Sequence, residues 1–311
     1  YTRIFLISFG CSMVINTLQE TRDMVFNQDN DMNKEIIWSL QFSEDESLRE
    51  NGNQTHLYFV PKYDANIPGM TRTVEYGRPY ARFKPTQFMS DLYDSSIDSR
   101  YQAYWRDTWY ATTATDKLSV GDTAFYLPKD AWSKAQIDSK NYKVFNPEFS
   151  ESLGSDYSTV SNRVFLHLKK FDDVKRATMN EEKGTRDWVC FRAAEAYLLA
   201  GEAYYRAGDV DNALKYINTL RRNCAIEGKE KEMEISASDL SVDFILDERA
   251  RELCGEGKRW YDLKRLGKLI ERTDLHNKKA HGNMKPFHEL RPIPQSQIDR
   301  CTNVYPQNPQ W

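Results

Sequence analysis

The stretch from Asp247 to Arg265, DERARELCGEGKRWYDLKR, contains the residue types that acid–base chemistry requires. It has eleven charged side chains in nineteen positions. Glu248 and Glu252 are four residues apart, so on a helix they would lie on the same side. Hydrolysis of a glycosidic bond needs two carboxyl groups about 5 to 10 Å apart, one of them with a raised pKa. The stretch is therefore the first candidate for an active site.

The charge pattern of this stretch nevertheless favours a structural role. Arg251 lies three residues from Glu248 and beside Glu252, and the other acids also have basic neighbours. A positive neighbour lowers the pKa of a carboxyl group, whereas a general acid needs an apolar pocket that raises it. We therefore predict a scaffold helix with a solvated or ion-paired charged face. The chain has 46 Asp and Glu residues, so a glycoside hydrolase built on another pair stays open as an alternative.

Sequence signatures of other chemistries are missing. The chain has no GxxxxGK[ST], GxGxxG or GxSxG pattern, which argues against the commonest nucleotide-binding and hydrolase sites. The five histidines show no HExxH spacing and the five cysteines no CxxC spacing, so we expect neither a metal nor a cofactor. The formal net charge of −3 gives no basic surplus for nucleic acid. No run approaches the roughly 18 apolar residues of a membrane-spanning helix.

The N-terminal segment YTRIFLISFGCSMV has a basic residue and a short apolar run before Cys11, an order also found in lipoprotein signals. Phe9 stands beside the position where cleavage would occur, and it fits such a signal badly. We interpret the segment as a core segment of a chain that lacks its true start. We do not expect Cys11 to be a lipid anchor, and we expect Cys190 and Cys254 to be buried thiols beside helix faces.

Two regions of different texture divide the chain. Residues 1–180 are interrupted by Gly, Pro, Asn and Asp, which indicates a loop-rich, ligand-binding region with short strands. Within it, KEIIWSLQF at 34–42 and NRVFLHLKKF at 162–171 have the β-branched and aromatic residues of buried strands. Residues 181–311 are helical in pattern. We expect one compact, mainly α unit in which the helices support the loops.

The helical region predicts three long helices with recognisable ends. RDWVCFRAAEAYLLAGEAYYRA, at residues 186–207, has apolar residues at spacings of three and four. Gly208 would end this helix and Asp209 would cap the next one. Ser241 would cap a third helix, whose apolar stripe extends to Cys254.

The first two helices resemble a tetratricopeptide repeat, with AEAYLLAGEAYYRAGDVDNALKYINTL at residues 194–220. Gly201 and Ala213 would lie where the helices cross, because larger side chains there would push the helices apart. One repeat is clear, whereas about three are needed for a stable solenoid. A tetratricopeptide-type adaptor that binds a peptide is therefore an alternative function.

Three motifs near the C-terminus are specific in combination: ILDERARELCGEGKRWYDLKRLGK at 245–268, LRPIPQSQID at 290–299 and YPQNPQW at 305–311. Together they resemble the SusD/RagB family, glycan-binding lipoproteins of the outer surface of Bacteroidetes. KPTQFMSDLYDSSIDSRYQAYW at 84–105 and the helix pair are similar to further segments of the family. The resemblance covers roughly residues 30–311.

The resemblance implies both a fold and a function. The fold would consist of tetratricopeptide-type helix pairs that brace a loop-rich ligand-binding region. The function would be non-catalytic binding of an oligosaccharide at the outer membrane and its delivery to a partner, a TonB-dependent transporter of the SusC type. Family members are longer and have a lipidated N-terminal Cys. This chain would correspond to their C-terminal part, and membrane association would depend on a lipid anchor outside it.

A glycan site is expected where aromatic residues concentrate. Residues 51–110 hold thirteen Phe, Tyr or Trp, and turn signals such as Asn51-Gly52 and Gly77 indicate long loops there. Sugars present flat apolar faces and a rim of hydroxyls, which exposed rings and polar side chains match. The predicted ligand-binding residues are Tyr58, Tyr63, Tyr76, Arg78, Tyr80 and Trp109.

The alternative for each of these tyrosines is that it pins the loops to the helical core. The same applies to the tryptophans. At least one of Trp105 and Trp109 is expected in the core. Trp38, in a strand, and Trp188 and Trp260, in helices, are interpreted as packing residues.

Overall fold

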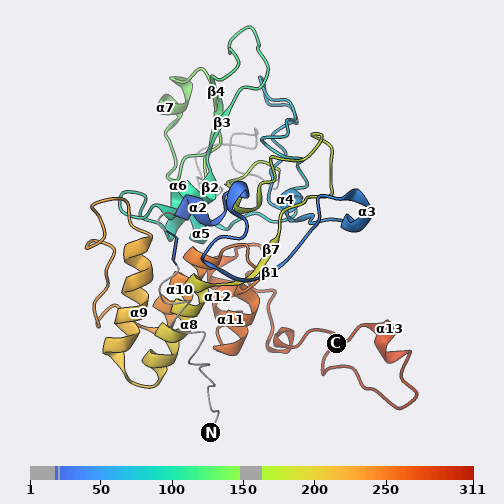
Figure 1. The fold of residues 1–311 in the computed structure, drawn as a ribbon, viewed down its shortest axis with the longest axis vertical. Helices are drawn as coiled ribbons and strands as arrows, with labels where there is room; N and C mark the ends of the chain where they lie inside the picture. Colours follow the sequence, from blue (N-terminus) through green and yellow to red (C-terminus); the bar gives the residue numbers. More distant parts are fainter. Residues whose placement is uncertain (1–17, 20–21, 148–162) are drawn as a thin grey trace. The chain divides into compact units, whose positions relative to one another are not determined.

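The computed structural model of the chain describes residues 18–19, 22–147 and 163–311 (Figure 1). The N-terminal segment that contains Cys11 lies outside the described residues. Within the described part, helices dominate and strands are few and short, as predicted. None of the described helices is both long and apolar enough to cross a membrane.

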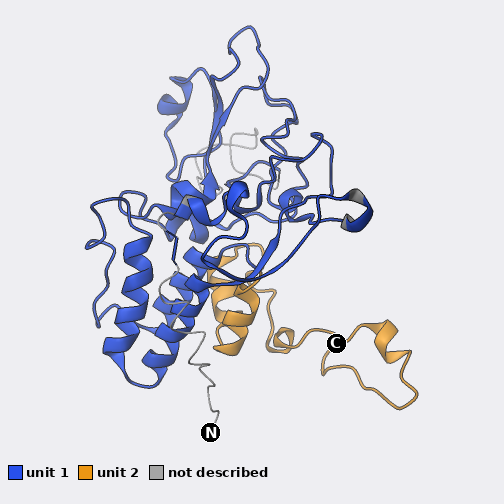
Figure 2. Ribbon diagram, in the orientation of Figure 1, with its two compact units in different colours: residues 1–256 blue, residues 257–311 orange. Residues whose placement is uncertain are grey.

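The chain forms two compact units, residues 1–256 and residues 257–311, called unit 1 and unit 2 below (Figure 2). Unit 1 combines the loop-rich region with the long helices α8 (Ala193–Arg206), α9 (Val210–Asn223) and α10 (Val242–Leu253). The compact units thus divide at residue 256, whereas the texture of the sequence changes near residue 180. The physical reason is that charged side chains of α10 are buried against partners from the loop-rich region.

The other elements of unit 1 are short. They are α2 (Arg22–Val25), η1 (Gln28–Asn30), β1 (Ile36–Leu40), α3 (Glu46–Arg49), α4 (Thr55–Tyr58), α5 (Gln87–Asp91), α6 (Arg100–Tyr104), β2 (Trp105–Arg106), β3 (Thr108–Tyr110), β4 (Thr123–Tyr126), α7 (Lys134–Asp138), β5 (Lys143–Val144), β6 (His167–Leu168), η2 (Lys169–Phe171) and β7 (Trp188–Arg192). The strands form small sheets: β1 pairs with β7, β2 pairs with β6, and β4 lies between β3 and β5. The β4–β5 pair is parallel, and the other pairs are antiparallel.

Strand β7 replaces the first turns of a predicted helix. The sequence predicts a helix from Arg186, but α8 begins only at Ala193. The run of Trp, Val, Cys and Phe in β7 has the aromatic and β-branched residues that suit a strand, and β1 supplies its hydrogen-bonding partner. The prediction that Trp188 is helical is therefore wrong. Its ring packs on that of Phe171, with the ring centroids 5.5 Å apart.

Strand β1 confirms the first predicted strand but not its burial. Trp38 is 61% exposed, and Ile37 and Leu40 are exposed as well. The interpretation of Trp38 as a packing residue is therefore wrong. The second predicted strand is reduced to the two residues of β6, which continue directly into the 3-10 helix η2.

The ends of the long helices form as predicted. The Asp209 carboxylate caps α9 by accepting a hydrogen bond from the backbone N–H of Asn212 at 3.1 Å. The Ser241 hydroxyl caps α10 by accepting one from Phe244 at 3.0 Å. Gly208 follows α8 with a φ of +84°, a conformation that favours glycine.

The close crossing of α8 and α9 depends on Gly201. A Cβ atom at this position would lie 2.6 Å from Cγ1 of Ile217, so a larger residue would force the helices apart. Ala213 is fully buried at the same crossing, as predicted. The assignment of the pair to the tetratricopeptide type stays a prediction.

Aromatic residues form much of the core of unit 1. Trp109 stacks between Tyr63 and Phe125, at ring-centroid distances of 4.8 and 5.2 Å. Trp105 lies in a second buried cluster. Both tryptophans are therefore core residues, where at least one was expected. Cys254 is buried as predicted, whereas Cys190, in β7, is only half-buried.

Unit 2 contains the last two predicted family motifs. Its elements are α11 (Arg259–Arg265), α12 (Leu269–His276), η3 (Pro286–Glu289) and α13 (Gln295–Ile298). The guanidinium of Arg291 lies over the ring of Trp260, 4.7 Å from its centroid, so Trp260 is a packing residue as predicted. The indole N–H of Trp311 donates a hydrogen bond to the carbonyl of Leu290 at 2.7 Å, which fixes the end of the chain within this unit.

Candidate functional site

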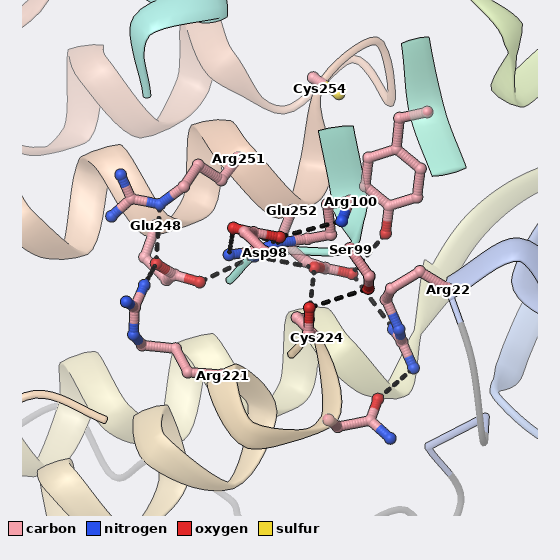
Figure 3. A network of polar contacts seen from close by, with 12 residues as sticks. Arg22, Asp98, Ser99, Arg100, Arg221, Cys224, Glu248, Arg251, Glu252 and Cys254 are labelled. Carbon is pink, nitrogen blue, oxygen red and sulfur yellow. Dashed lines mark hydrogen bonds and ion pairs between the residues drawn. The ribbon is translucent and has the colours of Figure 1, made fainter. Parts of the chain in front are cut away.

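Glu248 and Glu252, the acids considered for catalysis, are fully buried in a network of ion pairs (Figure 3). The carboxylate of Glu248 lies 2.8 Å from the guanidinium of Arg100 and 2.9 Å from that of Arg251. It also pairs with Arg221. A carboxylate enclosed by three cations and closed to solvent offers no access to a substrate.

Glu252 binds a second set of cations. Its carboxylate lies 2.6 Å from Arg192, 3.1 Å from Arg100 and 3.4 Å from Arg22. Burial alone would raise the pKa of Glu252, but these guanidiniums outweigh burial and hold its pKa well below the ordinary value. The same balance lowers the pKa of Glu248. Both groups are therefore ionised at neutral pH, and neither can donate a proton as the general acid of a hydrolase.

The ion-pair network joins segments that are far apart in the sequence. Arg192 in β7 also pairs with Glu35 at 2.7 Å and with Glu256 at 2.8 Å. Lys170 in η2 pairs with Glu256 at 2.8 Å and donates to the carbonyl of Glu252 at 2.7 Å. The charged stretch is thus an ion-paired scaffold, as predicted, and its key acids are buried rather than solvated.

Three of the predicted ligand-binding residues are part of the core. Tyr63 and Trp109 are fully buried, and Tyr76 is 5% exposed. The Tyr63 hydroxyl donates to the carbonyl of Gly77 at 2.7 Å, and the Tyr76 hydroxyl accepts from the backbone N–H of Tyr110 at 3.2 Å. The prediction that these three rings contact a ligand is therefore wrong. They pin the loops to the core, which was the stated alternative.

The other three predicted residues, Tyr58, Arg78 and Tyr80, lie together at the surface. Each is partly exposed. Backbone hydrogen bonds join their segments, because Tyr80 donates to the carbonyl of Leu57 at 3.2 Å and Arg82 to that of Tyr58 at 2.8 Å. The guanidiniums of Arg78 and Arg82 lie 5.5 and 5.9 Å from the centroid of the Tyr80 ring.

Phe83 completes this group, which we call the Tyr80 surface: Tyr58, Arg78, Tyr80, Arg82 and Phe83. The Phe83 ring is 55% exposed and meets the Tyr58 ring edge to face, with the centroids 6.0 Å apart. Sequence reasoning missed Arg82 and Phe83. The signal was present, because both belong to the same short run, RPYARF, as Arg78 and Tyr80.

The loop of residues 178–184 supports the Tyr80 surface from one side. Arg78 pairs with Glu182 at 2.6 Å and donates to the carbonyl of Asn180 at 2.6 Å. A ring nitrogen of the buried His56 lies 3.0 Å from the carbonyl of Glu182. A hydrogen bond from the Tyr80 hydroxyl to the Glu182 carboxylate raises the pKa of Tyr80, so the hydroxyl proton is held by Glu182 and the phenol oxygen remains available as an acceptor.

The arrangement combines open aromatic rings with fixed hydrogen-bond donors. Rings of this kind match the apolar faces of sugars, and a phenol and two guanidiniums match the surrounding hydroxyls. Among the described residues, no group of acids, histidines and cysteines is placed to hold a metal ion. The Tyr80 surface therefore combines the two kinds of group, aromatic rings and hydrogen-bonding side chains, that sugar-binding sites use.

The fold is similar to that of a solved glycan-binding protein. The surface glycan-binding protein A from Bacteroides thetaiotaomicron, solved in complex with laminarihexaose, matches with a TM-score of 0.59. The match covers 96% of this chain and 58% of that chain, at 19% sequence identity. At this identity the likeness concerns the fold alone.

Sequence comparison assigns the family. Residues 34–311 match the model of the SusD family, and the chain belongs to this family. SusD-like protein P25 of Formosa agariphila is 27% identical over 282 residues, which are 88% of this chain and 48% of that protein. The starch-binding protein SusD of Bacteroides thetaiotaomicron is 31% identical over 122 residues, 38% of this chain and 20% of that protein. The chain thus spans about half the length of P25, and its match to SusD covers a fifth of that protein.

Proposed function

We propose that this chain binds an oligosaccharide at the Tyr80 surface, as part of a non-catalytic glycan-binding protein. The observation that carries the proposal is the group of open rings flanked by two guanidiniums in a chain of the SusD family. The name of the starch-binding relative supports a glucan as the ligand, and the structural neighbour solved with laminarihexaose supplies a second glucan to compare. The two glucans to test first are therefore a laminarin-type and a starch-type oligosaccharide.

The rings and the polar groups have different tasks in this proposal. Phe83 and Tyr58 supply the apolar contact for one face of a pyranose ring. The hydroxyl of Tyr80 and the guanidiniums of Arg78 and Arg82 hydrogen-bond its hydroxyls. Each aromatic contact contributes about 0.5–1.5 kcal/mol beyond area burial, so a few such contacts stay far below the roughly 12 kcal/mol that corresponds to a Kd of about 1 nM. Weak binding suits a protein that must release its ligand to a partner.

We also propose where the complete protein works. As a lipid-anchored protein at the outer surface of the outer membrane, it would pass its glycan to a TonB-dependent transporter of the SusC type. Family membership supports this step. Purification of the full-length protein from native membranes should bring the transporter with it, and isolation of the protein without a transporter under mild detergent would argue against the partnership.

The proposal excludes hydrolysis of the bound glycan. Its support is the state of Glu248 and Glu252, which are closed to solvent and held ionised by arginines. Incubation with laminarin or starch should therefore release no reducing sugar. Release that survives further purification would reinstate the glycoside hydrolase alternative.

Isothermal titration with laminarihexaose and maltohexaose tests the site. Phe83→Ala should weaken binding about tenfold, since one lost ring contact is worth about 1.4 kcal/mol. Tyr80→Ala should weaken binding about two- to tenfold, since the lost hydrogen bond of its hydroxyl is worth about 0.5–1.5 kcal/mol. Tyr261→Ala is the matched control, because Tyr261 is 67% exposed but belongs to unit 2. Unchanged affinity in both surface variants, or an equal loss of affinity in the control, would contradict glycan binding at the Tyr80 surface.

A further inference from the structure

A second open aromatic surface lies around helix α7, on segments that the Tyr80 surface does not use. Trp132, just before α7, and Tyr126, at the end of β4, are both partly exposed. Their ring centroids are 5.3 Å apart and the ring planes are inclined by 48° to each other, an arrangement that we call the aromatic angle. The ammonium group of Lys140 lies 5.5 Å from the centroid of the Trp132 ring.

The backbone of Trp132 is fixed by a buried amide. Asn146 is fully buried, and its side chain accepts a hydrogen bond from the N–H of Trp132 at 3.0 Å and donates one to the carbonyl of Trp132 at 2.8 Å. The next residue, Ser133, forms a capping box with Gln136 at the start of α7. Because the backbone on both sides of Trp132 is held in place, the Trp132 ring loses little conformational freedom when a ligand stacks on it.

Polar groups border the two rings. Burial is the main cause that raises the pKa of Tyr126, and the nearby charges of Asp107 and Asp130 raise it further. Carboxylates and a phenol beside an aromatic angle are acceptors and donors for the hydroxyls of a sugar, and Lys140 adds a flexible donor.

A pocket adjoins this surface along the chain. Leu127 and Pro128, which line it, follow Tyr126 directly, and Pro147 follows Asn146. The hydroxyl-bearing and amide residues Thr86, Gln87, Ser90 and Tyr101 also line the pocket. Tyr126 and Trp132 are not among the residues that line this pocket, so the pocket and the two rings are neighbours along the chain only.

We propose that Trp132 and Tyr126 form a second sugar-binding site, which takes a pyranose unit of the same glycan that the Tyr80 surface binds. The inference rests on the proposed function. In Figure 1, α7 lies at the left of the upper part of unit 1, whereas α4, which ends at Tyr58, lies at the right. A polysaccharide long enough to reach from one site to the other can engage both at once.

Engagement of two weak sites by one chain raises the affinity for a polymer without any new contact. The second binding event is intramolecular and benefits from a local ligand concentration in the millimolar range. The second site should thus matter more for the polymer than for the hexasaccharide. This difference gives the inference a signature of its own.

The first test compares polymer and hexasaccharide binding in Trp132→Ala, Tyr80→Ala and the wild type. Affinity electrophoresis in laminarin and in starch should show at least a tenfold loss for Trp132→Ala, while titration with the hexasaccharides should leave affinity at the Tyr80 surface unchanged. Trp38→Ala is the matched control, because Trp38 is an exposed tryptophan of unit 1 outside both surfaces. Thermal melting of each variant confirms that it is folded.

A direct probe makes the result independent of the polymer. With 5-fluorotryptophan labelling, Trp132→Phe identifies the fluorine resonance of Trp132. Laminarihexaose or maltohexaose should shift this resonance in the Tyr80→Ala background and leave the Trp38 resonance in place. An unshifted Trp132 resonance at saturating sugar would overturn the second site.

The outcomes separate this inference from the proposed function. Weaker polymer binding by Tyr80→Ala, with Trp132→Ala equal to the wild type, overturns the second site and leaves the proposed function intact. Weaker polymer binding by Trp132→Ala alone supports the second site and contradicts glycan binding at the Tyr80 surface. A wild type that binds neither glucan overturns both.

Discussion

Replacement of Glu252 by Gln tests the buried ion-pair network most sharply. The substitution preserves the size of the side chain but removes the negative charge that lies within 3.4 Å of Arg192, Arg100 and Arg22. The remaining carboxylates cannot replace it, because Glu248 and Glu35 already serve the same guanidiniums. Removal of one partner from a buried pair costs about 3–5 kcal/mol.

The expected loss is a substantial fraction of the free energy of unfolding of a typical domain, about 5–15 kcal/mol. Unit 1 spans 256 residues, for which 1 kcal/mol corresponds to about 2 °C in melting temperature. Glu252→Gln should therefore melt about 6–10 °C below the wild type at pH 7, measured by calorimetry. Glu232→Gln is the control, since Glu232 forms only an exposed pair with Lys229 and should change the melting temperature by about 1 °C or less.

The pH dependence of this difference follows from the lowered pKa of Glu252. A folded-state pKa below the unfolded value, about 4.3 for Glu, adds stability that is fully present above that value and is lost as the pH falls below it. The gap between wild type and Glu252→Gln should therefore be largest at pH 7 and narrow near pH 3. A variant that melts with the wild type at pH 7, or a gap that widens in acid, would refute the role assigned to the network.

Three further predictions concern single contacts of the scaffold. Gly201→Ala should destabilise unit 1 by about 1–3 kcal/mol in denaturant unfolding, because its Cβ would meet Ile217; an unchanged midpoint would contradict the close crossing. Ser241→Ala should cost about 1 kcal/mol through the lost cap of α10, whereas Ser241→Asp should keep most of the stability. Tyr63→Phe should cost about 1–2 kcal/mol, because the buried carbonyl of Gly77 loses its donor, yet leave the affinity for hexasaccharide unchanged; weaker binding at equal stability would mean that Tyr63 contacts the ligand after all.

Local signals in the sequence predicted local structure well. Ser241 and Asp209 cap helices through contacts with residues only three positions away. The sequence predicts Gly201 at the helix crossing, because two closely packed helices need a small residue at their contact whatever the position of the partner helix. The predicted helix start is wrong at Trp188. Antiparallel pairing with β1, about 150 residues earlier in the chain, makes this segment a strand.

The burial of the charged stretch could not be predicted from its own residues. Its acids are neutralised by Arg22, Arg100 and Arg192, which lie between 60 and 230 residues from Glu252. The sequence shows the charges of α10 but not these distant partners. Ion pairing was therefore predictable and burial was not.

The same dependence on distant partners separates the buried from the exposed members of the predicted ligand-binding residues. Tyr63 and Tyr80 lie in one loop-rich segment of similar composition. Tyr63 is buried because Trp109, from strand β3, packs against it, whereas Tyr80 has guanidiniums beside its ring and remains partly exposed. Composition located the aromatic region, and long-range packing selected the rings that remain open.

The most direct measurement of the central claim is a crystal structure of the protein with the hexasaccharide that binds it. We expect electron density for a pyranose ring against Phe83 and Tyr58, with the sugar hydroxyls hydrogen-bonded to Arg78, Tyr80 or Arg82. Density for the sugar only at another position, with the Tyr80 surface in contact with solvent alone, would contradict it.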